Sequence, residues 1–371
     1  RSTFGEWTIT GVGFKASVDH DPSTRNPFDF LKGGSSDQPL PSGRVKVQDI
    51  SVSVTDPDSG NTWKLSRTKA DIRLKPDQVD VVVSGELADP LKKSGWFQTK
   101  VSVHVPEPGK AVSNTHAAPS DVRAPQWRAE WKTESLPLSV IGFAAGVAQP
   151  TPAAMRTLVE GGLSSSIRLK GWEDRSVLAD IDYVTVHDLR VARGDIKNSI
   201  CVLQEATVGG QVRVNKERID IKQLMGTSDF TSLEINGSFG GPSTFAAAAE
   251  KPVTWLGTSD AVANIKLDIT KFQSAFPGLI PLPRFTSFES GGIRVKTEPA
   301  AVSSGNGRTI SLSVHDVRAR TRYGSVELQS IELDSRLAYR DGLVRAEEIQ
   351  LRSEFAGATV VGDPASGSAE L

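Results

Sequence analysis

Histidine and cysteine are the residues of this sequence best suited to metal or nucleophilic chemistry, and their spacing supports neither. Zinc sites use ligands at short recurring spacings, such as His-Glu-x-x-His or paired cysteines. His104, His187 and His315 instead lie in runs of alternating apolar and polar residues, and the single Cys201 has no histidine near it in the sequence. Apolar neighbours raise the pKa of a thiol, so we interpret Cys201 as structural. We expect neither a metal nor a cofactor.

An acidic segment, Asp56–Asn61, spaces two aspartates as some calcium loops do. A calcium loop of the EF-hand type needs further oxygen ligands, a distal glutamate and flanking helices. Here the segment is followed by Trp63-Lys64-Leu65, which continues as strand. Pro presets φ for a turn, and Gly or Asn accepts a positive φ. We therefore interpret Asp56–Asn61 as a hairpin turn.

Motifs for covalent or acid-base catalysis are not recognisable either. The sequence has no Gly-x-Ser-x-Gly, and the glycine-rich run Gly237–Gly241 lacks the Lys-Ser/Thr ending of a phosphate loop. Glu347 and Glu348 are adjacent on an expected strand, so they point to opposite faces and cannot flank one bond. An all-β glycosidase with carboxylates from distant strands remains open. We predict a non-enzymatic protein.

Composition narrows the class of partner. The chain has 371 residues, 23% of them charged, with a formal net charge of −1. Nucleic-acid binding usually appears as a basic surplus, so no nucleic-acid partner is expected. No stretch reaches the ~20 apolar residues of a membrane-spanning helix. Because the first residue is Arg, we expect the chain to be a piece of a longer protein.

The elements that position these residues are strands. Alternation of apolar with polar residues, the period of a half-buried strand, recurs from Gly5–Val18 onwards. Three long runs, Arg308–Tyr323, Val326–Tyr339 and Leu343–Phe355, are separated by the tight links Gly324-Ser325 and Asp341-Gly342. Such runs predict a mainly β fold, with long antiparallel strands in an elongated, curled sheet that has one apolar and one charged face.

One strand changes phase within itself. Val45 and Val47 fall on odd positions, whereas Ile50, Val52 and Val54 fall on even positions. A slip of one residue turns every later side chain to the other face unless an extra residue is accommodated. The sequence therefore predicts a β-bulge near Gln48–Asp49.

Two short helical inserts are expected within a repeated unit. In Leu136–Lys170, the segments Pro137–Val147 and Pro152–Val159 precede a double glycine, Gly161-Gly162, that opens a strand. Ile265–Glu298 repeats this order: a strand, a short apolar segment and a double glycine, 130 residues later. We expect Pro152–Val159 and Lys271–Phe276 to occupy equivalent positions. The sequence is accordingly divided into an N-terminal β segment, residues 1–135, and two repeat-like units, residues 136–264 and 265–371.

This combination resembles a known family. The carrying features are the repeated unit, the strand-glycine motifs VSGEL and INGSF, and the hairpin VSVTDPDSGNTWKLSRTKADIRL. Together they resemble the AsmA-like and TamB-like proteins of the bacterial envelope, which belong to the repeating β-groove, bridge-like lipid-transfer proteins. The resemblance implies a sheet folded into a trough whose apolar interior accommodates lipid acyl chains. It also implies a periplasmic location, a parent protein anchored to the inner membrane by an N-terminal segment, and a role in lipid transport or outer-membrane biogenesis.

The candidates for the groove lining are apolar residues on alternating strand positions, which in most proteins form ordinary core. The alternative is a structural or carbohydrate-binding β module of a large surface protein, with Trp63, Trp96, Trp127 or Trp172 as a sugar platform. The lining candidates are Leu163, Ile167, Leu169, Ile219, Ile221, Leu233, Ile235, Ile293, Val295, Ile310, Leu312 and Val314.

Overall fold

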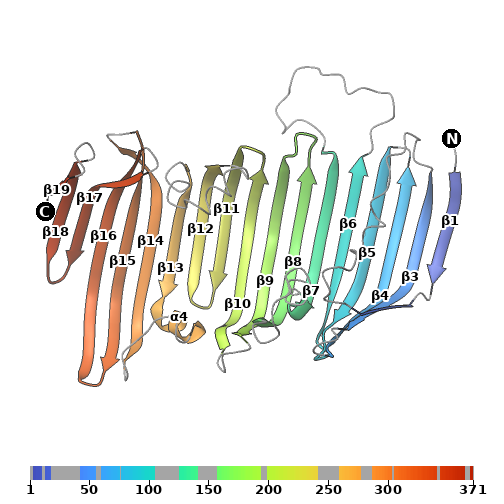
Figure 1. Ribbon diagram of the computed structural model, residues 1–371, viewed down its shortest axis with the longest axis horizontal. Helices are drawn as coiled ribbons and strands as arrows, with labels where there is room; N and C mark the ends of the chain where they lie inside the picture. The colour runs from blue at the N-terminus through green and yellow to red at the C-terminus, as the bar shows by residue number, and fades with distance from the viewer. Residues whose placement is uncertain are drawn as a thin grey trace, which may run out of the picture. The chain divides into compact units, whose positions relative to one another are not determined.

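The computed structural model describes residues 3–10, 13–17, 42–55, 60–75, 77–104, 125–140, 157–193, 199–240, 259–276, 286–302, 305–340, 343–363 and 368–370. These residues form nineteen strands and one complete helix, α4 (Figure 1). The chain divides into two compact units. Unit 1 comprises residues 1–173 and 186–199, and unit 2 comprises residues 174–185 and 200–371. Strand β9 (Val177–Arg193) is divided between the units, with residues 177–185 in unit 2 and residues 186–193 in unit 1.

Unit 1 is a sheet of consecutive strands. β3 pairs in parallel with both β1 and β2, and from β3 to β8 each strand pairs antiparallel with the next. The sequence run Gly5–Val18 was expected as one strand, but it is divided into β1 and β2. The strands are β1 (Thr3–Thr10), β2 (Gly13–Ser17), β3 (Ser42–Thr55), β4 (Thr62–Lys75), β5 (Gln78–Ala88), β6 (Ser94–His104), β7 (Trp127–Pro137) and β8 (Thr157–Gly171).

Unit 2 is also a succession of antiparallel pairs, from β10 to β19. Helix α4 (Ile269–Ala275) lies between β13 and β14, and Asp268 caps it by accepting a hydrogen bond from the backbone N–H of Lys271. The strands are β10 (Ser199–Val214), β11 (Arg218–Ser228), β12 (Thr231–Gly240), β13 (Val262–Asp268), β14 (Ser287–Val302), β15 (Gly305–Thr321), β16 (Gly324–Arg340), β17 (Leu343–Ser353), β18 (Gly357–Asp363) and β19 (Ser368–Glu370).

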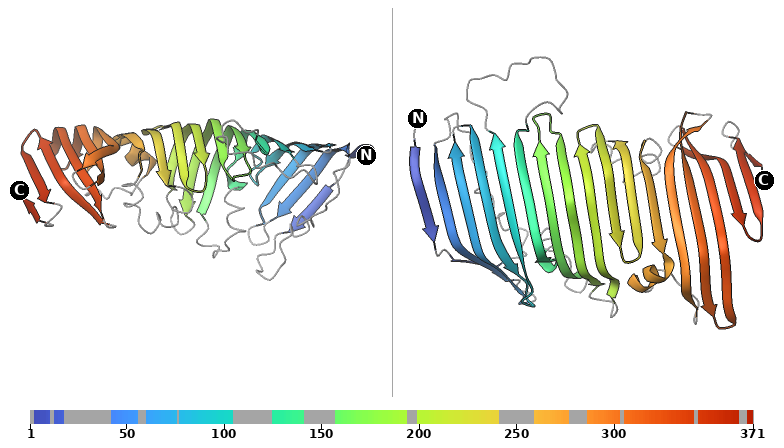
Figure 2. Two further views of the ribbon diagram at one scale, coloured as in Figure 1. Left: turned by 90° about the horizontal axis from the view of Figure 1, so that it is seen from above. Right: turned by 180° about the vertical axis from the view of Figure 1, so that it is seen from behind.

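In each unit the described strands lie side by side in one open, curled layer (Figures 1 and 2). The expected fold class, mainly β with long antiparallel strands in a curled sheet, is therefore confirmed. The strands reach 17 residues, well beyond the usual five or six. Because a single layer leaves both faces accessible, few apolar side chains among the described residues are buried: Trp63, Leu138, Cys201, Leu203, Ile219, Ala261, Ile269, Ala275 and Ala338.

The predicted bulge in β3 is confirmed. Its pairing with β4 shifts between Val47 and Ile50, and Asp49 has a φ of 57°. The extra residue absorbs the phase change of the sequence, so Val52, which pairs with Leu65, stays on the same face as Val47, which pairs with Ala70. The apolar face of unit 1 thereby continues along the whole strand.

Three expectations about local structure are wrong in detail. The double glycines lie inside β8 and β14, four residues after each strand begins, and do not open them. Thr157–Val159 belongs to β8 and not to a helix, and the rest of Pro152–Val159 lies outside the described residues. The link between β15 and β16 is Arg322-Tyr323, because Thr321 pairs directly with Gly324.

The two double glycines nevertheless have similar surroundings. Gly161 and Gly291 have φ values of 131° and 147°. A Cβ would lie 3.1 Å from Leu138 Cδ1 at Gly161 and 3.0 Å from Ile269 Cδ1 at Gly291. Leu138 directly follows β7, and Ile269 directly follows β13, so each glycine receives the first apolar side chain after a strand. The three-segment division and the equivalence of Pro152–Val159 with Lys271–Phe276 stay predictions.

Among the described residues, no helix has the length and apolar character needed to cross a membrane.

The surroundings of Gly161 give a testable prediction. A Cβ there would lie 2.7 Å from the carbonyl oxygen of His187, on a backbone that already has a positive φ. Gly161→Ala should lower the free energy of unfolding by about 1–3 kcal/mol, measured by urea denaturation followed by circular dichroism. The matched control is Gly162→Ala, whose Cβ would meet nothing closer than 3.6 Å. Equal losses in the two variants would contradict the argument.

Candidate functional site

An apolar face extends across unit 2. Residues paired directly across antiparallel strands point to the same face, so the register shows which side chains are neighbours. One uninterrupted row crosses six strands, from β12 to β17. We call the surface centred on this row the apolar face of unit 2; the row consists of Leu233, Ile265, Val295, Leu312, Leu333 and Leu351.

All nine lining candidates of unit 2 lie on this face. Ile293 and Val314 pair with each other in the row on one side, and Ile235 and Ile310 belong to the row on the other side. Gly237 and Phe239 lie two and four residues after Ile235 in β12, so alternation places them on the same face as Ile235. Ile221 pairs with Gly237 and Ile219 pairs with Phe239, so both isoleucines also lie on this face. The remaining candidates, Leu233, Val295 and Leu312, belong to the central row itself.

The exposure of these side chains distinguishes an accessible surface from a closed core. Ile219 is buried, with 5% of its surface exposed. The other eight candidates on this face are only half-buried, and their row neighbours Ile265 and Leu351 are 37% and 41% exposed. Isoleucine, leucine and valine in a closed core are usually buried almost completely. The apolar face of unit 2 is therefore accessible along its central row.

The three candidates of unit 1 share one face of β8. Ile167 pairs with Trp131, and Leu169 pairs with Ala129. Leu163 pairs with Leu136 beyond a bulge in β7 at which Ser135 has a φ of 51°. All three are half-buried. The row through Leu169 continues across the sheet of unit 1 as Ala129, Val101, Val81, Ile72 and Val45.

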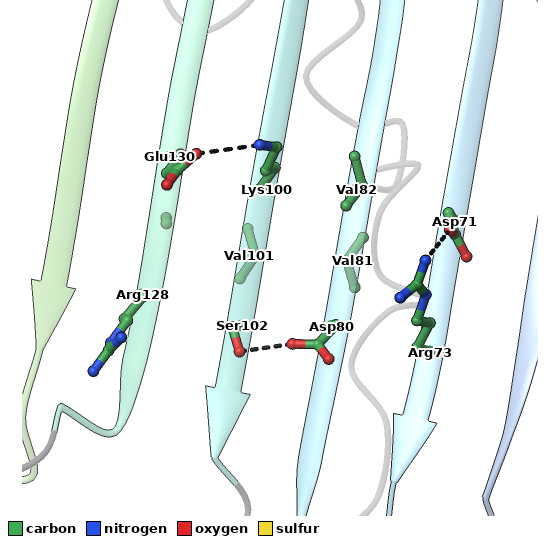
Figure 3. Close-up of a pocket in the computed structure, with 11 residues that line it drawn as sticks. Asp71, Arg73, Asp80, Val81, Val82, Lys100, Val101, Ser102, Arg128 and Glu130 are labelled. Carbon is green, nitrogen blue, oxygen red and sulfur yellow. Dashed lines mark hydrogen bonds and ion pairs between the residues drawn. The ribbon is translucent and has the colours of Figure 1, made fainter.

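The opposite face of unit 1 holds a shallow polar pocket of about 400 Å³ across β4 to β7 (Figure 3). Sequence reasoning did not find it, although polar residues alternate with valines along these strands. Its charges are mostly paired: Lys100 lies 3.4 Å from Glu130, and the hydroxyl of Ser102 donates to Asp80 at 2.7 Å. The charged and hydroxyl side chains that line it are Asp71, Arg73, Asp80, Lys100, Ser102, Arg128 and Glu130.

The acids of this pocket are held in the ionised form. Arg44 donates to both carboxylate oxygens of Asp71, at 2.8 and 2.5 Å, and this hydrogen bonding lowers the pKa of Asp71 to about 2. Burial raises the pKa of Asp80, but hydrogen bonds from Ser102 and Gln78 outweigh it and lower the pKa overall. Neither carboxyl is therefore poised to exchange a proton near neutral pH.

A buried arginine, Arg308, lies at one end of the apolar face of unit 2. Arg308 is 5% exposed and pairs across the sheet with Pro299 and Leu337. Its guanidinium donates to Thr297 Oγ1 at 2.8 Å, to the Ser259 carbonyl at 3.0 Å and to the Ala261 carbonyl. Burial lowers the pKa of Arg308. Most of its donors are engaged with protein oxygens, so Arg308 acts as a structural clamp, which nothing in the sequence indicated.

The other residues considered from the sequence do not come together as a site. Trp127 lies on the apolar face of unit 1, opposite Val103, whereas Trp96 lies on the other face, opposite Glu86. Trp63 is 9% exposed.

The cysteine, the acidic turn and the histidines do not form a site either. Burial raises the pKa of the Cys201 thiol. β3 and β4 form the predicted hairpin, with Gly60 at a φ of 68°, while Asp56 and Asp58 lie outside the described residues. His104, His187 and His315 lie in β6, β9 and β15, and the described residues contain no cluster of three potential metal ligands.

Comparison with known proteins does not assign the chain to a family. No family model matches the chain, and comparisons with curated proteins and with solved structures also gave no match.

The Asp71 ion pair gives a prediction about acid stability. Because the pKa of Asp71 is lower in the folded state than its ordinary 3.8, the pair stabilises the fold above that pH. The stabilisation is lost as the pH falls from about 4 to about 2. Asp71→Asn should therefore lower the free energy of unfolding by about 1 kcal/mol at pH 7 and have little effect near pH 2.

The partner residue supplies the control for this prediction. Arg44→Gln should cost a similar amount at pH 7, and the double variant should lose little more than either single variant. Additive losses in the double variant, measured by thermal unfolding at both pH values, would show that the two residues do not act as a pair.

Proposed function

We propose that this protein is a non-enzymatic module that binds lipid acyl chains on its apolar sheet face. The observation that supports this most directly is the accessible row of leucine, isoleucine and valine across β12 to β17. A row of six strands spaced about 4.8 Å apart extends about 24 Å, which accommodates a large part of an extended acyl chain. Burying such a chain gains ~0.8 kcal/mol for each CH₂ removed from water.

The chemistry of the face suits the hydrocarbon part of a lipid. Its central row contains no hydrogen-bond donor or acceptor in its side chains. Such a surface binds apolar chains without distinguishing head groups. Unit 1 presents a second apolar row on β3 to β8, ending at Leu169. Two surfaces of this kind suit a protein that carries or conducts lipid better than one that transforms it.

The charged side chains support a non-enzymatic role. Most of those in the polar pocket of unit 1 are held in ion pairs, such as Lys100 with Glu130 and Asp71 with Arg44, and burial raises the pKa of the Cys201 thiol. Our further proposals, a periplasmic location, anchoring of the parent protein to the inner membrane and a role in lipid transport or outer-membrane biogenesis, rest on the sequence resemblance alone.

The test compares two variants of neighbouring residues in β15. Leu312 lies between Val295 and Leu333 on the apolar face, and Ser313 lies on the opposite face between Arg294 and Glu332. Leu312→Glu should reduce the phospholipid that co-purifies with the protein at least several-fold, because a carboxylate would be placed against the bound chain. Native mass spectrometry and thin-layer chromatography of the organic extract measure the lipid.

Ser313→Glu is the matched control and should retain the lipid of the unaltered protein. Circular dichroism of both variants checks that the sheet is intact. Unaltered protein that purifies without lipid and does not take up a fluorescent fatty acid would overturn the proposal. Equal lipid loss in Leu312→Glu and Ser313→Glu would also overturn it, because the two side chains point to opposite faces.

A further inference from the structure

The end of the β15–β16 hairpin extends beyond its neighbour β17. We call residues 317–328 the hairpin end. Within it, Val317 pairs with Leu328 and Thr321 pairs with Gly324. β17 pairs with β16 only from Ile331 onwards, so the described residues provide no strand partner along the outer edge of β16 within the hairpin end. Figure 1 shows the hairpin continuing past the end of β17.

The tip carries an exposed aromatic residue next to an apolar row. Tyr323, in the turn, is 93% exposed, and Val326 is 59% exposed. Val326 pairs with Ala319, which pairs with Phe288 on β14, so one apolar row crosses three strands and ends at Val326. Large apolar side chains that project together from a protein surface commonly mark an interaction site.

The same hairpin end carries a surplus of positive charge. It contains three arginines and one glutamate, a surplus of two, although the whole chain has a net charge of −1. Arg318 forms an ion pair with Glu327 at 2.7 Å. The exposed side chains of Arg320 and Arg322 have no hydrogen-bond or ion-pair partner among the described residues. Two arginines without a partner among the described residues therefore lie within three positions of the exposed Tyr323.

The pairing register separates these groups by face. Ala319 and Val326 share one face of the hairpin end, while Arg318 with Glu327 and Arg320 with Ser325 share the other. A strand pair that is apolar on one side, basic on the other and aromatic at its tip matches the boundary between lipid head groups and acyl chains. There, tyrosine lies at head-group depth and arginine binds lipid phosphate.

We infer that the hairpin end docks the protein on the surface of an anionic phospholipid bilayer. Arg320 and Arg322 bind lipid phosphates, and Tyr323 and Val326 enter the head-group region. The hairpin end shares no residue with the central row of the apolar face of unit 2, so this inference does not depend on acyl-chain binding along that row. A bilayer explains the apolar row together with the unpaired cations, whereas an acidic protein surface would account only for the cations.

The test measures binding to vesicles by co-sedimentation. The full chain should bind vesicles of phosphatidylcholine mixed with phosphatidylglycerol and bind phosphatidylcholine vesicles far more weakly, with the difference removed by high salt. Arg320→Gln and Arg322→Gln should each weaken binding about fivefold, and Tyr323→Ser should weaken it further. Arg294→Gln is the matched control, because Arg294 is an exposed arginine on β14 outside the hairpin end.

Insertion of the tip can be measured separately. Cys201 is the only cysteine, so Ser325→Cys in a Cys201→Ala background carries a single environment-sensitive dye at the hairpin end. Its emission should shift to shorter wavelength on anionic vesicles, and the same dye at Met225→Cys, a 57% exposed position in β11, should not shift. Circular dichroism confirms that each variant is folded.

Three results would overturn the inference: equal binding to neutral and anionic vesicles, unchanged binding of the arginine variants, or no shift of the dye at residue 325. Dimerisation through the open edge of β16 without vesicle binding would also overturn it. Failure here is distinguishable from failure of acyl-chain binding. Leu312→Glu should lose co-purified lipid and keep vesicle binding, and the double variant of Arg320 and Arg322 should do the reverse.

Discussion

Backbone hydrogen bonding between neighbouring strands is the interaction on which both units depend. In an ordinary domain a sheet is stabilised by a second layer that covers its apolar face. Here the described strands form one layer in each unit, and side chains as large as Leu312 and Ile167 stay half-buried. Long strands therefore supply stability that a two-layer core normally supplies, because each added residue extends the hydrogen-bond ladders to both neighbouring strands. Consecutive pairing also makes most contacts local along the chain, which suits a sheet assembled strand after strand.

A one-layer sheet that presents an apolar face has to keep most of its apolar residues on that face over strands of up to 17 residues. The bulges make this possible. At Asp49, Ser135 and Gln223 the backbone has a positive φ and the strand register shifts. Each bulge accommodates one extra residue, so the apolar residues after it stay on the same face as those before it. At Gly161 and Gly291 a neighbouring apolar side chain lies about 3 Å from the position that a Cβ would take.

The two faces of the sheet have different chemistry. On the polar side, ion pairs link neighbouring strands: Asp71 pairs with Arg44, and Lys100 pairs with Glu130. These charged side chains keep that face hydrated. On the apolar side, leucine, isoleucine and valine meet in rows that the described residues leave accessible. In each unit the division gathers most of the leucine, isoleucine and valine side chains on one face. Arg308 and helix α4 add the few compact contacts of unit 2, through the Ser259 and Ala261 carbonyls and through the ring contacts of Phe230, Phe272 and Phe276.

The sequence by itself determined the strand class, most strand positions, the bulge near Asp49 and the membership of the apolar face. All of these follow from a period of two residues, which is a local property of the chain. It placed the double glycines at the starts of strands and the β15–β16 link at Gly324-Ser325, both displaced by a few residues, because strand ends depend on pairing with neighbours. Only the tertiary structure decided that Leu312 and its row remain accessible, since alternation is the same in a covered sheet and an open one. Arg308, the pocket around Asp71 and Asp80, and the projecting hairpin end also required it, because each depends on which strands are neighbours and where one neighbour stops.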